Sequence, residues 1–247
     1  MNKIIFTLLM ILISVSVCSA SPNNMSLDLE TGLAQSGYNN VRIPGDTGTK
    51  VSLYNELKPD DALFVRLRLN YHLTKKNIFS LLIAPLTINS NGKVNRDLHF
   101  AGADFPANTE LHTTFKFNSY RLTYRYTLFQ GKAFSFACGI TGKIRDAKIQ
   151  IKSNQLEAEK KDLGFVPLIN FKLDYIFNDR LNLLCMGDAL AAPQGRAEDV
   201  LLAAVYNTSD KLKFKLGYRV IEGGADNDAV YTFSLIHYYV IGGMFYF

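Results

Sequence analysis

Strict alternation between apolar and polar side chains is the feature of this sequence that most restricts its fold. Residues 113–128 show it most clearly from residue 119 on: Tyr120, Leu122, Tyr124, Tyr126 and Leu128 alternate with Ser119, Arg121, Thr123, Arg125 and Thr127. A period of two residues places the two sets on opposite faces of a β-strand. No long segment shows the 3.6-residue apolar period of a helix, so we expect an all-β chain.

The alternation recurs along the chain and predicts ten strands. Besides 113–128, clear cases are 26–34, 62–73, 133–152, 162–177, 211–221 and 229–247, and weaker ones are 78–89, 181–190 and 200–208. The polar faces mix arginine and lysine with small hydroxyl residues, a composition that suits the wet interior of a barrel. Residues 50–57 leave an alternative open, because an added hairpin there would raise the count to twelve. A bulge is expected at Pro85, since a closed barrel has no edge strand to accommodate proline.

The predicted connections alternate between short and long. Tight polar turns lie at 74–77, 130–132, 178–180 and 209–210, and longer connections at 37–61, 90–112, 153–161, 191–197 and 222–228. Short periplasmic turns opposite long extracellular loops are typical of transmembrane barrels. An even strand count places both termini in the periplasm. The pattern therefore predicts a single closed antiparallel transmembrane β-barrel.

The N-terminus has the pattern of a cleaved signal peptide. Lys3 precedes the apolar run Ile4–Val17, and small residues at Cys18 and Ala20 allow cleavage after Ala20. The run is shorter than the roughly 18–20 residues that a membrane-spanning helix needs. We therefore expect residues 1–20 to be a signal peptide and residues 21–247 to form one barrel domain. The formal charge of +5 falls to +4 without Lys3, and no basic run indicates nucleic-acid binding.

The C-terminal strand carries a family resemblance. Residues 229–247 alternate regularly and stop on Phe247, which resembles the signal by which outer-membrane proteins are recognised for barrel insertion. With the leader and the alternating strands, the chain resembles Gram-negative outer-membrane β-barrel proteins of an uncharacterised family. The resemblance implies a cell outer-membrane location, contact with outer-membrane lipid and lipopolysaccharide, and recognition by the barrel-assembly machinery through the strand that ends at Phe247. The size also resembles that of the omptin proteases, but no omptin motif is matched by any residue.

Charged residues on the polar faces form a predicted lumen set. The set contains Arg66, Arg68, Arg121, Arg125, Lys143, Arg145, Lys172, Lys213, Lys215 and Arg219, against Asp28, Glu30, Asp174 and Asp188. One interpretation is a basic interior that binds or conducts anions. We favour a packed network of ion pairs, because small barrels fill their interior with side chains. Asp174 is the expected partner of Arg125, and Asp188 lies at the height of Arg121.

A second set lies near the expected extracellular rim. It contains Arg196, Glu198, Asp199, Glu222, Asp226, Asp228 and His237. A histidine oriented by a carboxylate could act as a general base on lipid A or on peptides. By parity, however, His237 shares the lipid-facing register of Leu235 and Tyr239, which argues against catalysis. Asp226 and Asp228 do not have a diagnostic calcium spacing, and no metal or cofactor is expected.

Three functions follow as hypotheses. The first is a non-enzymatic outer-membrane protein with a structural or surface-interaction role and a lumen largely plugged by charged side chains. The second is an enzyme that modifies lipid A or cleaves peptides at the rim. The third is a narrow anion-conducting pore. The first is favoured because the sequence contains no resolved catalytic set.

Overall fold

A computed structural model describes residues 24–193 and 195–247. The expected signal peptide at residues 1–20 lies outside the described part of the chain. No helix in the described ranges is long and apolar enough to cross a membrane. Every regular element described is a β-strand, which confirms the all-β prediction.

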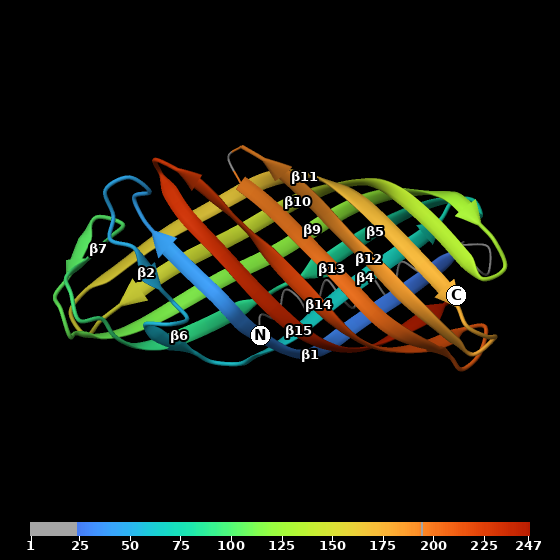
Figure 1. Cartoon of the computed structure of the whole chain (residues 1–247), viewed down its shortest axis with the longest axis horizontal. Helices are drawn as coiled ribbons and strands as arrows, with labels where there is room; N and C mark the ends of the chain where they lie inside the picture. The colour runs from blue at the N-terminus through green and yellow to red at the C-terminus, as the bar shows by residue number, and fades with distance from the viewer. Residues whose placement is uncertain (1–23, 194) are drawn as a thin grey trace.

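Ten strand positions form a closed antiparallel ring (Figure 1). Two positions are each occupied by two consecutive segments, β3 with β4 and β5 with β6. In ring order the strands are β1 (Met25–Arg42), β3 (Leu57–Pro59) with β4 (Ala62–His72), β5 (Asn77–Ala84) with β6 (Thr87–Lys93), β9 (Glu110–Gln130), β10 (Phe134–Lys152), β11 (Glu157–Ile176), β12 (Leu181–Ala192), β13 (Gly195–Asn207), β14 (Leu212–Asn227) and β15 (Val230–Tyr246). The first and last strands close the ring, with pairs running from Ser26 opposite Tyr246 to Arg42 opposite Tyr231.

Residues 50–57 do not add a hairpin to the ring, so the count is ten and not twelve. The short strand β2 (Val51–Ser52) pairs only with β1, and β3 pairs with β6. The third short pair, β7 (Leu98–Phe100) with β8 (Ala103–Phe105), forms a separate two-stranded sheet. Figure 1 shows β2 and β7 at one end of a long barrel, remote from the four tight turns. Both described chain ends lie on the turn side, since Phe247 N donates to Met25 O.

Three connections expected to be long are mostly strand. Residues 153–161, 191–197 and 222–228 shrink to short links, because β11, β12, β13 and β14 run further than the alternation indicated. Beyond the apolar band the contrast changes parity on β9 and β10, because inward residues such as Phe115, Ile149 and Ile151 are buried and apolar there while their outward neighbours are polar. The backbone ladder nevertheless continues, because each strand keeps a neighbour that satisfies its N–H and C=O groups.

Pro85 interrupts its strand as expected, although the irregularity extends to the neighbouring strand. β5 ends at Ala84 and β6 begins at Thr87, yet both pair with β9 in one continuous register. On the other side, β5 pairs with β4 and β6 pairs with β3, and the registers of these two pairs differ by one residue. Leu86 N, beside the proline, donates to the Asn118 side chain at 3.2 Å.

The two faces of the wall confirm the predicted register. Arg121 and Arg125 are each only 3% exposed, whereas Leu122 between them is 56% exposed. The exposed apolar side chains form a lipid-facing band, which includes aromatic residues at the turn ends, namely Tyr71, Tyr126, Phe134, Phe177, Tyr206 and Phe247. The structure is therefore a barrel with an apolar exterior and a polar middle.

The extracellular half of the interior has an apolar core that the sequence did not indicate. We call residues 43–56 and 94–109 the cap. Its two segments are joined by hydrogen bonds from Thr49 N to His99 O and from Ala101 N to Ile43 O, both at 2.8 Å. Buried apolar side chains from the cap and the adjacent strands pack together, including Val41, Ile43, Val51, Leu53, Leu57, Ile88, Leu98, Phe100, Phe105 and Leu111.

Candidate functional site: the charged lumen network

Asp199 is the centre of a buried ion network in the middle of the lumen. Its carboxylate meets Arg66 Nη2 at 2.8 Å and Arg121 Nη2 at 2.6 Å, and it also accepts a hydrogen bond from Arg219. These guanidinium groups come from β4, β9 and β14, so one carboxylate joins strands from different parts of the ring. All four side chains are at most 4% exposed.

Glu30 is the second centre and shares two of the same arginines. Arg219 Nη2 donates to both carboxylate oxygens at 2.8 Å, and Arg66 Nε lies 3.4 Å away. Lys215 Nζ donates to Glu30 at 2.7 Å and to Asp28 at 2.5 Å. Arginine suits this role because its planar group can bind two carboxylates at once. Arg219 therefore links Glu30 on β1 to Asp199 on β13.

Asp188 extends the network toward β9, β10 and β11. Arg121 Nη1 donates to it at 2.6 Å, Thr141 Oγ1 at 2.7 Å and Asn170 Nδ2 at 2.6 Å. The pairing of Arg121 with Asp188 agrees with their predicted common height. The predicted partner of Arg125 is wrong: Arg125 Nε donates to Asn170 Oδ1 at 2.7 Å. Asp174 binds Lys172 instead, at 2.8 Å.

The remaining lumen residues differ in their surroundings. Lys143 is buried, with its ammonium group 4.6 Å from the centroid of the Phe117 ring. Arg145 is partly exposed and pairs with Asp162 near the extracellular end. Arg68 is buried but makes no hydrogen bond or ion pair with any described residue. Ten of the fourteen residues in the predicted lumen set are nine-tenths or more buried, namely Arg66, Arg68, Arg121, Arg125, Lys143, Lys215, Arg219, Asp28, Glu30 and Asp188.

The rim candidates do not form one constellation. Asp199, expected in a rim loop, is buried in the lumen because β13 continues to Gly195 and alternation turns residue 199 inward. Glu198 faces outward beside it, and Asp226 is exposed near the tip of β14. His237 is on the outer wall, where its ring contacts the Tyr218 hydroxyl. The parity argument for His237 therefore holds.

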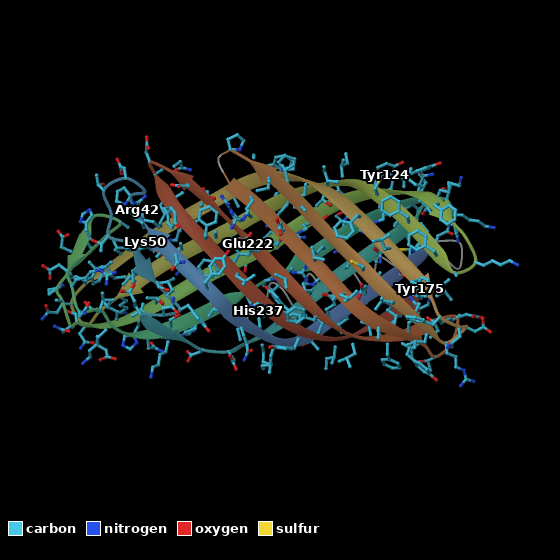
Figure 2. All side chains as sticks on the ribbon, viewed as in Figure 1. Arg42, Lys50, Tyr124, Tyr175, Glu222 and His237 are labelled. Carbon is cyan, nitrogen blue, oxygen red and sulfur yellow. The ribbon has the colours of Figure 1, made fainter. Side chains whose placement is uncertain are left out.

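Glu222 belongs to an outer-wall cluster beyond the lipid-facing band. Arg196 Nε and Nη2 donate to its two oxygens at 2.7 and 2.8 Å, and the Tyr38 hydroxyl also donates to it. Partial burial raises the pKa of Glu222, but the hydrogen bonds from Arg196 and Tyr38 outweigh it and lower the pKa overall. A carboxylate held ionised in this way is a poor proton donor. Figure 2 shows Glu222 and His237 along the wall.

Sequence reasoning missed Asp199 as a lumen residue for an identifiable reason. The inner face of β13 continues from Asp199 through Leu201, Ala203 and Val205, all buried and apolar. The contrast between an apolar outer face and a polar inner face is thus absent on β13. Only the even spacing of Asp199 from these buried residues could have indicated that it faces the lumen. Within residues 24–193 and 195–247, no group of three or more His, Cys, Asp or Glu side chains is arranged to hold a metal ion.

Comparison with known proteins shows the fold and not a specific activity. The sequence matches no known protein family, and no curated protein is significantly similar to it. Among solved structures, the outer membrane protease OmpT from Escherichia coli matches with a TM-score of 0.56 and 12% identity, over 93% of this chain and 98% of that chain. The translocator domain of the autotransporter NalP from Neisseria meningitidis matches with a TM-score of 0.45 and 10% identity, over 96% and 92%. The closed ten-stranded ring and its likeness to OmpT show that this chain has the fold of an outer-membrane β-barrel.

Proposed function

We propose that this protein is a non-conducting outer-membrane barrel whose interior serves stability and whose function lies at the cell surface. The observation that supports the proposal is the ion network around Glu30, Asp199 and Asp188. Its side chains come from β1, β4, β9, β12, β13 and β14, so they meet across the ring instead of lining one wall. Side chains bound to one another across a narrow barrel occupy the path that an ion would need.

The cap gives independent support for a blocked interior. Phe100 and Phe105 are at most 1% exposed, and Leu53 and Leu57 pack in the same cluster. An apolar core of this kind is close-packed and excludes water. Ions would therefore meet a dry layer at the extracellular side and a charged network below it.

Planar-bilayer recording tests the proposal against the alternative of a narrow anion pore. We expect purified protein to insert without stable single-channel currents in KCl at about 1 M. At that concentration the Debye length is about 3 Å, so surface charges do not keep ions away from the barrel. The Phe100→Ala, Phe105→Ala double variant, which removes part of the cap core, should also show no currents, because the ion network still blocks the lumen. Currents should appear only when substitutions in the network are added to it. Steady anion-selective currents from the wild-type protein would refute the proposal and establish the pore.

The outer wall supports a surface role in contact with anionic lipid. Arg42 and Lys50 lie 5.4 and 4.9 Å from the centroid of the Tyr231 ring, and Arg196 lies 5.0 Å from that of Phe233. Figure 2 shows Arg42 and Lys50 near β2, toward the end remote from the turns. Cations held over aromatic rings beside a lipid-facing band suit the phosphates of lipopolysaccharide.

A binding assay distinguishes this lipid contact from non-specific binding of lipopolysaccharide. We expect the Arg42→Gln, Lys50→Gln double variant to lose the thermal stabilisation that added lipopolysaccharide provides, while Arg180→Gln, in an exposed turn, retains it. Equal stabilisation of both variants would exclude this cluster as the contact.

Recognition of Phe247 by the assembly machinery is a separate proposal, tested by the folded yield of Phe247→Ala in the outer membrane.

The enzymatic alternative has weaker support, because its candidate residues face the lumen, the outer wall and the strand tips separately. Two assays on a deletion strain test it directly. We expect an unchanged mass profile of lipid A and unchanged cleavage of peptides by intact cells. A difference in either that the wild-type gene restores would establish an enzyme and overturn the non-enzymatic proposal.

A further inference from the structure

The ladder between β11 and β12 stops partway along the wall. Its last pair is Ile169 opposite Ala189, although β11 continues to Glu157 and β12 to Ala192. On the cap side of that pair, no described residue of either strand pairs with the other, while β11 stays paired with β10 as far as Glu157. Figure 1 shows β10 and β11 continuing to the cap end of the barrel, whereas β12 stops well before it. The two strands are therefore splayed apart along this seam, and the ring is closed on its turn side.

Pro167 gives the physical reason for the splayed seam. Phe177 N donates to Leu181 O, on the β12 side, at 3.0 Å. Because the N–H groups of a strand alternate between its two neighbours, the other odd-numbered residues of β11 also direct their N–H and C=O groups toward β12. The first such residue beyond the last pair is Pro167, which in the same register would lie opposite Ala191. Proline has no N–H to donate at that position, so the ladder ends there.

A groove of about 480 Å³ lies at the seam and is lined almost entirely by apolar residues. Phe165 and Ile169, which are 71% and 60% exposed, line it from the outer face of β11. Leu168, only 4% exposed, and Leu190 also line it. Both belong to the inner face by alternation, since Leu190 shares the parity of the buried Asp188 on β12. The groove therefore leads from the lipid-facing band into the seam between the two strands.

The backbone beside the groove has hydrogen-bonding groups without a strand partner. Leu163 and Phe165 are odd-numbered residues of β11, so their N–H and C=O groups point toward the seam. Their side chains, 75% and 71% exposed, belong to the lipid-facing band. Backbone groups that face hydrocarbon without a partner are costly. The occupant that fits the seam must therefore combine an apolar chain with a hydrogen-bond acceptor, and a lipid acyl chain with its ester or amide linkage has both.

We propose that the seam between β11 and β12 binds one acyl chain of a lipid from the surrounding membrane. The chain lies in the groove against Phe165 and Ile169 and reaches Leu190, while the carbonyl oxygen of its linkage accepts a hydrogen bond from the backbone N–H of Phe165. The groove is continuous with the lipid-facing band, so the chain enters sideways and crosses neither the cap nor the ion network. This site is separate from Arg42 and Lys50, which belong to β1 and to the cap.

Fluorescence quenching in vesicles tests the proposal. The chain contains no tryptophan, so a single introduced tryptophan reports only its own surroundings. The vesicles contain phosphatidylcholine with brominated acyl chains, and bromine quenches an indole ring that it contacts. Leu190→Trp is the test variant, and two neighbouring residues of β15 give matched controls: Tyr239→Trp faces lipid at 52% exposure, and Tyr238→Trp faces the lumen at 2%. We expect strong quenching of Leu190→Trp and Tyr239→Trp and little quenching of Tyr238→Trp.

Pro167→Val tests the cause of the opening. Valine supplies the missing N–H, so the ladder can extend by one more pair and narrow the seam. Quenching of the Leu190→Trp reporter should therefore fall when Pro167→Val is added, whereas quenching of Tyr239→Trp should not change. Equal quenching of Leu190→Trp with and without Pro167→Val would overturn the assignment of the opening to this proline.

Heat-modifiable migration on gels shows whether each variant is folded, and Leu168→Trp provides a second reporter from the β11 side of the seam. The proposal is overturned if Leu190→Trp and Leu168→Trp, once folded, are quenched no more than Tyr238→Trp. That result would mean that the seam is closed in the membrane, by a rearranged ladder or by a strand of another protein. Ionic current does not enter this test, so its outcome is independent of the proposed function.

Discussion

Arg219→Met should destabilise the barrel more than any substitution of an exposed arginine. The wild-type side chain is 2% exposed and binds Glu30 through two hydrogen bonds and Asp199 through a third. Methionine fills similar volume but leaves both carboxylates with fewer cations. Removing one partner of a buried ion pair costs about 3–5 kcal/mol, because the remaining charge stays buried.

The lower end of that range applies here, because neither carboxylate is left without a cation. Glu30 keeps Lys215 and Arg66, and Asp199 keeps Arg66 and Arg121. For a chain of this length each 1 kcal/mol shifts the unfolding temperature by roughly 2–4 °C, so a loss of about 3 kcal/mol lowers it by roughly 6–12 °C. The assay is the temperature at which the folded band converts to the unfolded band on unboiled gels, checked by the urea midpoint.

Two further variants make this prediction refutable. Arg180→Met, in an exposed turn, is the matched control and should leave the conversion temperature unchanged. Glu30→Gln combined with Arg219→Met should cost less than the sum of the two single changes, because the two side chains share one interaction. A conversion temperature for Arg219→Met within roughly 2 °C of the wild type, less than the shift that 1 kcal/mol produces, would refute the view that the network stabilises the barrel.

Three more outcomes follow from individual contacts. Arg125→Met should lower the conversion temperature only slightly, because Arg125 makes a single hydrogen bond, to Asn170, and it should leave bilayer conductance near zero; an anion-selective current that changes with this residue would contradict a blocked lumen. Gly32→Ala should reduce the yield of refolded barrel, because Gly32 has a φ of +141° and an added Cβ would lie 1.9 Å from Tyr239 O, and normal refolding would refute the close packing of β1 on β15. In the cap, the hydrogen bond from Arg96, which outweighs partial burial, lowers the pKa of Glu56; its stabilisation is therefore present above the unfolded pKa of about 4.3 and is lost as pH falls through the lowered folded value. The wild type should consequently unfold at a higher temperature than Glu56→Gln at pH 7, and the difference should vanish once the pH is below the lowered pKa of Glu56. A difference that persists in that acidic range would show that the ion pair is not its cause.

The amino-acid sequence by itself determined the strand type and the facing of most side chains, whereas the choice between ten and twelve strands needed the structure. Within the membrane one face of each strand meets lipid and the other meets the lumen, so apolar and polar residues alternate along the sequence. That is why the inward positions of Arg121 and Arg125 and the outward position of His237 follow from parity alone. The tight turns were equally readable, because they join strands where the apolar band ends.

Tertiary structure alone decided which charges meet and where the strands stop. Alternation reports the face of a residue but not its partner across the ring, since strand tilt and stagger set which side chains reach the same point. Arg125 therefore meets Asn170 and not Asp174, and Asp199 joins three arginines from three strands. Beyond the apolar band the contrast changes parity while backbone hydrogen bonding continues, so the alternation within the band indicated neither the extended hairpins nor the apolar core of the cap.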